Sequence, residues 1–314
     1  MTLVESHRKV EGDSMVRIDR VVQELTGRTR ADVRGLFDHG CVRLNHELCT
    51  QAGLRAKPGD TVAVRHDPKM RYHEKPKQRE NTAFHLVLED EHLLVVDKSA
   101  ALLTVPTDRG ETNTLFDAIG RYLNRRGHRG RPVVVHRLDR GTSGLLVFAK
   151  NPRVASELRD QFRVRKAERE YAVLVVGTLE REHGTFTSRL ATTKSLQRYS
   201  LGPGWKGDGQ ESERAVTHFR VQQPLQGATW VTASLETGKR NQIRVHFAEA
   251  GHPVLGDERY RADLAHHPAW TAKRLALHAA VLGFEHPRSH KWLRFESPLP
   301  PEFERFLART RIHG

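Results

Sequence analysis

In the first quarter of the chain, apolar residues show the spacing of helices and then the short runs typical of strands. From Ile18 to Leu25, and again from Val33 to Phe37, they recur every three to four positions, which predicts two amphipathic helices. Gly27 is placed to end the first helix and Thr29 to cap the second. Runs rich in β-branched residues then predict two short strands, at residues 41–45 and 61–66.

The segments that flank this pattern lack it. Residues 1–15 are polar and predict a flexible tail. Residues 67–83 show no apolar periodicity and carry five Lys or Arg residues, which is typical of a basic linker. We therefore expect a small α/β domain at residues 16–66 and a second domain at residues 84–314.

The second domain is dominated by short apolar runs such as LLVVDK, GLLVFAK and YAVLVVG. Many of these predicted strands follow one another along the chain, as strands in hairpins do. This arrangement favours an α+β fold with a mixed, largely antiparallel sheet over a regular alternation of strand and helix. Helical spacing occurs between the strands, at residues 114–126, 152–166, 241–250 and 301–309.

The chain of 314 residues is strongly basic. It has 52 Lys and Arg against 38 Asp and Glu, a net charge of +14. Residues 1–83 contribute +4 and residues 84–314 contribute +10, so both domains are basic. A surplus of this size favours a polyanionic partner, most simply a nucleic acid. An arginine-rich composition without such a partner is the alternative explanation.

Several other classes of protein are disfavoured. No segment approaches the run of about 20 apolar residues that spans a bilayer, so we expect no membrane partner. The N-terminus lacks the apolar core of a secretory signal. The two cysteines, Cys41 and Cys49, form no CxxC pair and no disulfide framework. Together these features predict a cytoplasmic protein.

Familiar cofactor and metal motifs are present only in fragments. The spacing GxGxxG at residues 202–207 contains a proline and does not open a helix, as a dinucleotide site requires. The turn at residues 141–144 lacks the GxSxG spacing of a nucleophile elbow. The 19 histidines have no cysteine partners and no HExxH frame. We therefore expect neither a cofactor nor a metal.

One segment, residues 133–150, combines two apolar runs with charge at the turn between them. If the strand predicted for the first run extends as far as Asp139, the side chains of Arg137 and Asp139 point to the same face of that strand. The neighbouring charges of Arg137 and Arg140 then favour the ionised form of Asp139. On these grounds alone, Asp139 is equally well explained as a catalytic carboxylate and as half of a structural ion pair.

The run His136-Arg-Leu-Asp-x-x-Thr-Ser-Gly-Leu-Leu146 resembles the signature of the RluA/RluD-type RNA pseudouridine synthases. Further similarity to this family follows in the same order along the chain, at residues 89–98, 166–177, 235–257 and 275–300. The chain departs from the family pattern at Asp97-Lys98-Ser99, where Asn-Lys-Pro is usual. A second departure is Lys239-Arg240-Asn241, where Arg-Thr-His is frequent.

The resemblance implies isomerisation of uridine to pseudouridine, with Asp139 as the catalytic carboxylate. It implies that Tyr171 packs against the flipped base, with a possible second role as the base that deprotonates C5. Arg244 would pair with Asp139, and Arg137 would fill the space that the base vacates. Matching motif positions Thr142 and Gln242 are expected to bind substrate. Without the resemblance, Tyr171 could be an ordinary strand aromatic and Arg244 could face water.

Residues 16–66 resemble an S4 domain, an RNA-binding module. The resemblance implies that Arg30 and Arg34, on the second helix, meet RNA phosphates; a solvated helix face is the alternative. The arginine-rich segment at residues 121–131 is expected to grip phosphates as well, or to be a solvated basic loop.

Two other functions compete with this hypothesis. A base-excising glycosidase usually needs two carboxylates, and residues 118–138 contain none. A non-catalytic RNA-binding or ribosome-assembly protein would not need Asp139, Tyr171 and Arg244 together. Because S4-bearing members of the family commonly modify large-subunit ribosomal RNA, we expect 23S ribosomal RNA as the target of a monomeric enzyme, with tRNA as the alternative.

Overall fold

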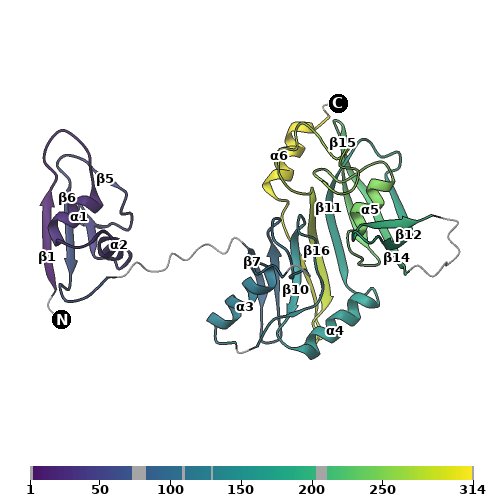
Figure 1. Ribbon diagram of the computed structural model, residues 1–314, viewed down its shortest axis with the longest axis horizontal. Helices are drawn as coiled ribbons and strands as arrows, with labels where there is room; N and C mark the ends of the chain where they lie inside the picture. The colour runs from purple at the N-terminus through teal and green to yellow at the C-terminus, as the bar shows by residue number, and fades with distance from the viewer. Residues whose placement is uncertain (1–2, 73–82, 108–109, 129, 203–210, 313–314) are drawn as a thin grey trace. The chain divides into compact units, whose positions relative to one another are not determined.

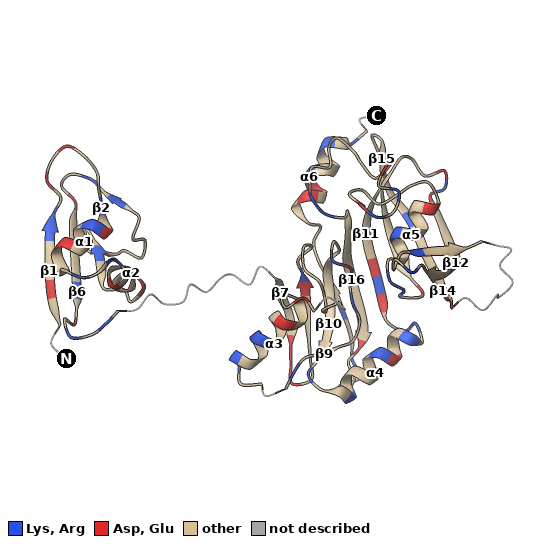
Figure 2. Cartoon of the chain, viewed as in Figure 1, with Lys and Arg blue, Asp and Glu red and all other residues tan. Residues whose placement is uncertain are grey.

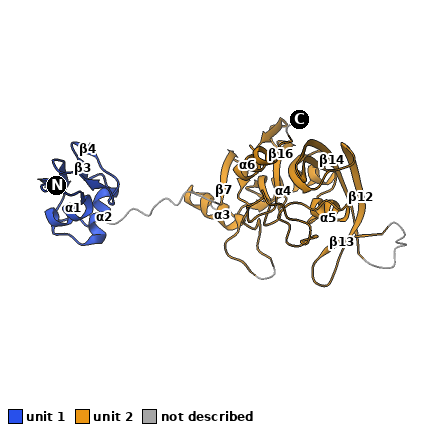
Figure 3. Ribbon diagram, turned by 90° about the horizontal axis from the view of Figure 1, so that it is seen from above, with its two compact units in different colours: residues 1–80 blue, residues 81–314 orange. Residues whose placement is uncertain are grey.

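The computed structural model describes residues 3–72, 83–107, 110–128, 130–202 and 211–312. The chain forms two compact units, residues 1–80 and 81–314 (Figures 1 and 3). The boundary between the units falls within the expected linker. None of the helices in the described ranges combines the length and the apolar composition needed to span a membrane.

The first unit packs two helices against a small antiparallel sheet. The helices α1 (Ile18–Thr26) and α2 (Arg30–Asp38) confirm both helical predictions. Gly27 ends α1 in the left-handed conformation, with φ of 63°, and the Thr29 side chain accepts the N–H of Asp32 at the start of α2. The sheet order is β1 (Val4–Lys9), β6 (Thr61–His66), β3 (Val42–Leu44) and β4 (Glu47–Leu48), and β2 (Val16–Arg17) pairs with β5 (Arg55–Ala56).

Both segments expected to be irregular at the edges of this unit are partly ordered. Residues 4–9 form the edge strand β1, which pairs along its whole length with β6. Its side chains are almost all exposed, so backbone pairing holds it and no apolar pattern revealed it. Tyr72, within the expected linker, is buried in the core of the first unit, and its hydroxyl accepts the N–H of Asp67. Residues 73–82 lie outside the described residues.

The second unit is built on one large sheet (Figure 1). Every strand pairing in its described residues is antiparallel except that of β10 with β16. The predicted mixed, largely antiparallel α+β fold is therefore confirmed. The strands follow the order β13 (Arg198–Leu201), β12 (His183–Thr192), β14 (Glu213–Leu225), β15 (Ala228–Leu235), β11 (Glu168–Val176), β16 (Leu277–Glu285), β10 (Ser143–Ala149), β8 (Leu93–Lys98) and β7 (Phe84–Glu89), while β9 (Val133–Val134) pairs with β10 and β17 (Trp292–Glu296) with β16.

Helices cover both faces of this sheet, as the alternation within its strands requires. Leu94 and Val96 of β8 lie in the same apolar core as α3 (Leu115–Arg125) and α6 (Pro301–Thr310), whereas Leu93 and Val95 pack with α4 (Pro152–Arg163). The fourth helix, α5 (Gln242–Glu249), joins the first core through Ile243 and Phe247. All four helices predicted for this domain are present.

Candidate active site

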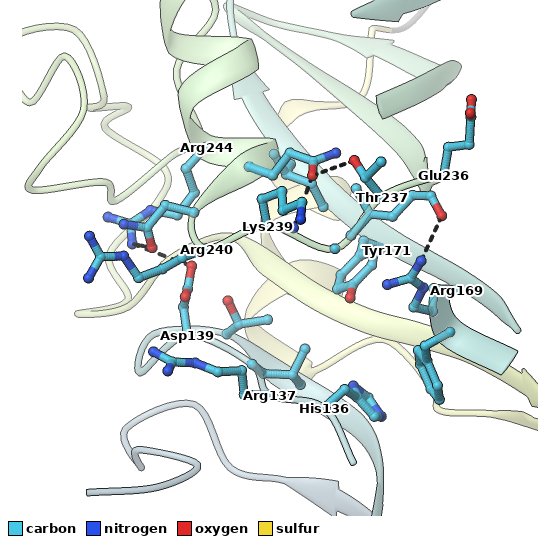
Figure 4. Close-up of a pocket in the computed structure, with 18 of the residues that line it drawn as sticks. His136, Arg137, Asp139, Arg169, Tyr171, Glu236, Thr237, Lys239, Arg240 and Arg244 are labelled. Carbon is cyan, nitrogen blue, oxygen red and sulfur yellow. Dashed lines mark hydrogen bonds and ion pairs between the residues drawn. The ribbon is translucent and has the colours of Figure 1, made fainter. Parts of the chain in front are cut away.

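A cavity of about 520 Å³ lies where three segments of the second unit meet (Figure 4). The segments are the loop that follows β9, the strand β11 and the turn that leads into α5. Six of the predicted site residues line the cavity: Arg137, Asp139, Thr142, Tyr171, Gln242 and Arg244. Arg30 and Arg34 instead line a hollow of about 220 Å³ in the first unit.

Asp139 lies in a loop, not at the end of a strand. The strand β9 ends at Val134, so the alternation argument that placed Arg137 and Asp139 on one strand face does not apply. The preceding residue, Leu138, is buried, and its N–H and C=O both bond to the Thr104 hydroxyl, at 3.1 and 2.8 Å. Thr104, which the sequence did not single out, therefore anchors the backbone beside Asp139.

The turn after Asp139 requires Gly144. Its φ of 110° lies in a region that favours glycine, and it pairs with Ala279 where β10 and β16 run parallel. A Cβ at this position would lie 2.2 Å from the Ala279 carbonyl oxygen. The glycine lets β10 approach β16 closely and so places the Asp139 loop beside the sheet.

Arg244 is held mainly by Asp257, a residue that the sequence offered only as part of a motif. Its guanidinium makes two hydrogen bonds of 2.7 Å to the Asp257 carboxylate, whose side chain is fully buried. The third nitrogen lies 3.7 Å from an Asp139 oxygen. Burial lowers the pKa of Arg244, but the bonds and charge of Asp257, with a smaller contribution from Asp139, leave this pKa raised. Arg244 is thus a fixed cation beside Asp139.

Asn241, one of the departures from the family pattern, begins the helix that carries Arg244. It adopts the left-handed conformation, with φ of 57°, which asparagine tolerates better than most residues. Its side chain accepts a hydrogen bond from Arg244 at 3.1 Å and donates one to the Tyr260 hydroxyl at 2.9 Å. The Tyr260 ring lies 5.0 Å from the Arg244 guanidinium. Asn241 and Tyr260 therefore complete the support of Arg244.

Tyr171 lies on β11, opposite Ala233 of β15 and Ala279 of β16. The residue is buried in the apolar core and borders the cavity. Burial raises the pKa of its phenol, and the charge of Asp139 adds to this rise while that of Arg169 opposes it. Burial thus disfavours the phenolate, the form of Tyr171 that could accept a proton.

Thr142 and Gln242 differ in what they can offer a ligand. The Thr142 hydroxyl is buried and has no hydrogen-bond partner among the described residues. The Gln242 amide, in contrast, is fully engaged: its oxygen accepts from Thr237 and from the Lys239 N–H, and its nitrogen donates to the Val216 carbonyl and the Thr217 hydroxyl. Gln242 thus holds the turn before α5, and Thr142 is the better candidate for contacting substrate.

Arg137 and Arg240 line the cavity, and Arg259 lies beside Arg240. Arg137 is exposed there, and no carboxylate pairs with it within the described ranges. Arg240 and Arg259 both donate to the Leu196 carbonyl, at 2.6 and 2.7 Å. Burial lowers the pKa of Arg240, and the charges of Arg259 and Arg137 lower it further. These three cations lie close enough together to attract a phosphate chain.

Lys98, between the two residues of the other departure from the family pattern, is a buried amine whose charge interacts with that of Asp139. Its ammonium donates to the carbonyls of Ser99 and Leu102, at 2.8 and 2.7 Å. Burial, together with the charge of Arg274, lowers its pKa to about 7, although Asp139 and Asp97 act in the opposite direction.

Within the described residues, no three His, Cys, Asp or Glu side chains form a group that could hold a metal ion.

Comparisons with known proteins show which family this chain resembles. Residues 92–249 match the model of the RNA pseudouridylate synthase family. A ribosomal large subunit pseudouridine synthase D of Zymomonas mobilis is 35% identical over 306 residues, which cover 94% of each chain. An uncharacterised RNA pseudouridine synthase of Bacillus subtilis is 32% identical and covers 91% of each chain.

The fold has solved counterparts as well. The structure of human RNA pseudouridylate synthase domain containing 4 superposes with a TM-score of 0.56 at 20% identity, covering 73% of this chain and 94% of that one. The match to the family model and the 35% identity along nearly the whole chain show that this protein belongs to the RNA pseudouridylate synthase family.

Proposed function

We propose that this enzyme isomerises uridines of large-subunit ribosomal RNA to pseudouridine, with Asp139 as its catalytic carboxylate. The observation that carries the proposal is the placement of Asp139 in the cavity, 3.7 Å from the fixed guanidinium of Arg244 and near Tyr171. The ribosomal target rests on relatives from Zymomonas mobilis and Nitrosomonas europaea that are named ribosomal large subunit pseudouridine synthase D.

In this proposal the N1–C1′ bond of uridine breaks, the uracil turns within the cavity, and C5 bonds to C1′. Asp139 is oriented by Arg244 while its side chain stays 20% exposed, so it keeps a face open to the ribose. Arg244 cannot swing away freely, because two hydrogen bonds tie it to the fully buried carboxylate of Asp257. A guanidinium already fixed beside the carboxylate needs no reorganisation during the reaction.

The uridine has to leave its helix to reach this recessed carboxylate. Flipping a base costs a few kcal/mol of lost stacking, which an inserted side chain can offset in part. Arg137 suits that role because it stands exposed at the rim of the cavity. Its guanidinium is planar and can stack in the space that the base leaves.

The rest of the basic surface would hold the RNA. Lys and Arg residues occur on helices and loops of both units (Figure 2). In the first unit Arg30 and Arg34 of α2 line the same hollow as Arg17 and Arg20 of the α1 region. We propose that this S4-like unit binds phosphates there and adds affinity to the catalytic unit.

A second carboxylate, Glu236, also borders the cavity, and it bears on the glycosidase alternative. Glu236 is engaged in ion pairs with Arg165, Arg214 and His218. A general acid must reach the leaving group, and the contacts to Arg165, Arg214 and His218 already engage both carboxylate oxygens of Glu236. The site therefore supports isomerisation with one free carboxylate better than base excision with two.

The decisive test replaces Asp139 with Asn in the full-length chain. We expect Asp139→Asn to reduce pseudouridine formation by at least about a thousandfold, with unchanged melting temperature and RNA affinity. Asp263→Asn, at an exposed carboxylate paired with Arg261, is the matched control and should behave as wild type. Turnover near the wild-type rate in Asp139→Asn would overturn the assignment.

The target RNA needs its own experiment. A pseudouridine map of total RNA, compared between cells with and without this gene, should lose sites in large-subunit ribosomal RNA. Loss of tRNA sites would favour the tRNA alternative, and loss of none would favour a non-catalytic RNA-binding role. A monomeric enzyme acting in the cytoplasm completes the proposal; size-exclusion chromatography checks the first part and cell fractionation the second.

A further inference from the structure

Arg169 is a buried cation of the cavity that pairs with no carboxylate in the described part of the chain. It precedes Tyr171 by two positions on β11, so both side chains lie on the same face of that strand (Figure 4). Only 8% of the residue is exposed. Its guanidinium donates to the Leu235 carbonyl at 3.1 Å, and its Nε finds no hydrogen-bond partner among the described residues.

The surroundings of Arg169 hold the charge in place without neutralising it. The guanidinium lies 5.3 Å from the centre of the Phe162 ring, and Phe162 stacks on the His136 ring with 4.6 Å between centres. Burial lowers the pKa of His136 to about 3, so this ring is neutral. Burial also lowers the pKa of Arg169. A buried cation without an anion is costly, which indicates that its counterpart comes from a ligand.

Gly238 keeps room for this guanidinium at the wall of the cavity. A Cβ at position 238 would lie 2.5 Å from an Arg169 nitrogen, close enough to push the guanidinium aside. Gly238 and Arg169 both line the cavity, so a bound base can reach the charge from the open side. The absence of a side chain at Gly238 thus lets the Arg169 guanidinium stay at the cavity wall, where a ligand can contact it.

The chemistry of the proposed reaction supplies a matching anion. When the N1–C1′ bond breaks heterolytically, the bonding pair stays with the base, and uracil carries a negative charge shared by N1, O2 and O4. C5 later returns a pair to C1′, loses its proton, and N1 gains one, so the product is an isomer of the substrate. During the interval the detached base stays in the cavity and needs a cation.

Resting on the proposed function, we infer that Arg169 contacts a carbonyl oxygen of the target uracil and stabilises the negative charge of the detached base. Asp139, Tyr171 and Arg169 all line the cavity, with Tyr171 between the other two, so a base packed on the Tyr171 ring lies within reach of both charges (Figure 4). The buried Arg169 lies inside the cavity, so RNA phosphates bind instead to the exposed arginines at its rim.

The test compares Arg169→Gln and Arg169→Ala with wild type, using the full-length protein and a transcribed RNA that contains the mapped uridine. We expect kcat to fall about 100-fold in both variants, as for loss of a donor to a developing negative charge, with KM changed less than threefold. Millimolar guanidinium should restore part of kcat in Arg169→Ala, whereas equal ionic strength from sodium chloride should not.

Two further variants separate charge from folding. Gly238→Ala keeps the charge but displaces it, and we expect kcat to fall about tenfold with an unchanged melting temperature. Arg294→Gln is the matched control and should keep wild-type kcat. Arg294 is an exposed arginine of β17, and it pairs with Glu168, which lies on β11 beside Arg169. If Arg169→Gln fails to fold, guanidinium rescue of Arg169→Ala and the Gly238→Ala rate decide.

Three results would overturn the inference. These are a wild-type kcat in Arg169→Gln, a raised KM with unchanged kcat (which would indicate phosphate binding), and the absence of guanidinium rescue together with a normal Gly238→Ala rate. A wild-type protein that forms no pseudouridine would instead refute the proposed function, so the two failures can be told apart.

Discussion

The two arginine-lined hollows of this protein use the same residue type in opposite ways. In the first unit four arginines line a small hollow that contains one carboxylate, Asp19, and both Arg30 and Arg34 are exposed. In the second unit Arg169 is buried and packed on Phe162, and Arg244, whose side chain is 11% exposed, is bonded to Asp257.

The difference lies in how water and salt act on the two sets of charges. Exposed arginines that meet phosphates release counterions, so their contribution depends on salt and not on sequence. Buried arginines are already desolvated and held in one geometry, so their contribution is concentrated at the reacting atoms. The first hollow is therefore suited to affinity and the second to chemistry.

The strongest test of this contrast removes the charge that holds Arg244. Asp257→Asn keeps an oxygen for the N–H groups of Arg259 and Tyr260, which bond to Asp257 at 2.9 and 3.0 Å. It leaves Arg244 buried without its ion-pair partner, so we expect a loss of about 3 kcal/mol in the free energy of unfolding. We also expect pseudouridine formation to fall about 100-fold, because Arg244 no longer holds Asp139.

The corresponding change in the first unit is Asp19→Asn. Asp19 bonds to Arg17, whose side chain is 42% exposed. We expect this variant to lose less than about 1 kcal/mol in urea denaturation, since partly exposed ion pairs contribute little. Equal losses in the two variants would show that burial does not distinguish the hollows.

Acid should destabilise the catalytic unit through its buried neutral histidines. His246 of α5 is bonded to Ser188 and to Thr217, both at 2.9 Å, and burial lowers its pKa to about 4. Between pH 6.5 and pH 4, His246 binds a proton in the unfolded chain but stays neutral in the folded chain. The contribution of neutral His246 to the free energy of unfolding is therefore fully present above pH 6.5 and is lost as the pH falls toward 4.

We therefore expect wild type to lose about 1.4 kcal/mol more per pH unit than His246→Gln between pH 6 and pH 4.5. Urea denaturation at several pH values measures this difference. Parallel pH dependences in the two proteins would show that His246 takes up its proton equally readily in the folded and unfolded chains.

The smallest effect is expected in the first hollow. Arg30→Gln combined with Arg34→Gln should make the slope of log affinity against log salt shallower by about 2, with unchanged kcat. Arg8→Gln, at an exposed arginine of the same unit paired with Glu24, is the control. Filter binding from 50 to 300 mM salt checks the slope. A drop in kcat with an unchanged slope would reverse the roles assigned to the two hollows.

Features that depend on near neighbours in the chain were readable from the sequence. The helices α1 and α2 follow from apolar spacing, and Gly27 and Thr29 mark their ends, because capping acts within one turn. The candidate site was readable through ordered motifs. These carried Asp139, Tyr171 and Arg244 to one cavity although more than 100 residues separate the first from the last.

Contacts that depend on long-range packing were not readable. The edge strand β1 has no apolar pattern, because only its backbone is bound. The strand β9 ends at Val134, and farther along the loop the backbone of Leu138 bonds to the Thr104 hydroxyl. Neither partner lies near in sequence, so no local spacing could have indicated either contact.

The sequence by itself determined most of the helices and strands, the order of the motifs and the carboxylate to which we assign the chemistry. Only the tertiary structure decided the partners of the charges: Asp257 for Arg244, and none for Arg169 among the described residues. The physical reason is that a side chain's charge is the same everywhere in a sequence, whereas its desolvation and its counter-charge exist only after distant strands have packed together.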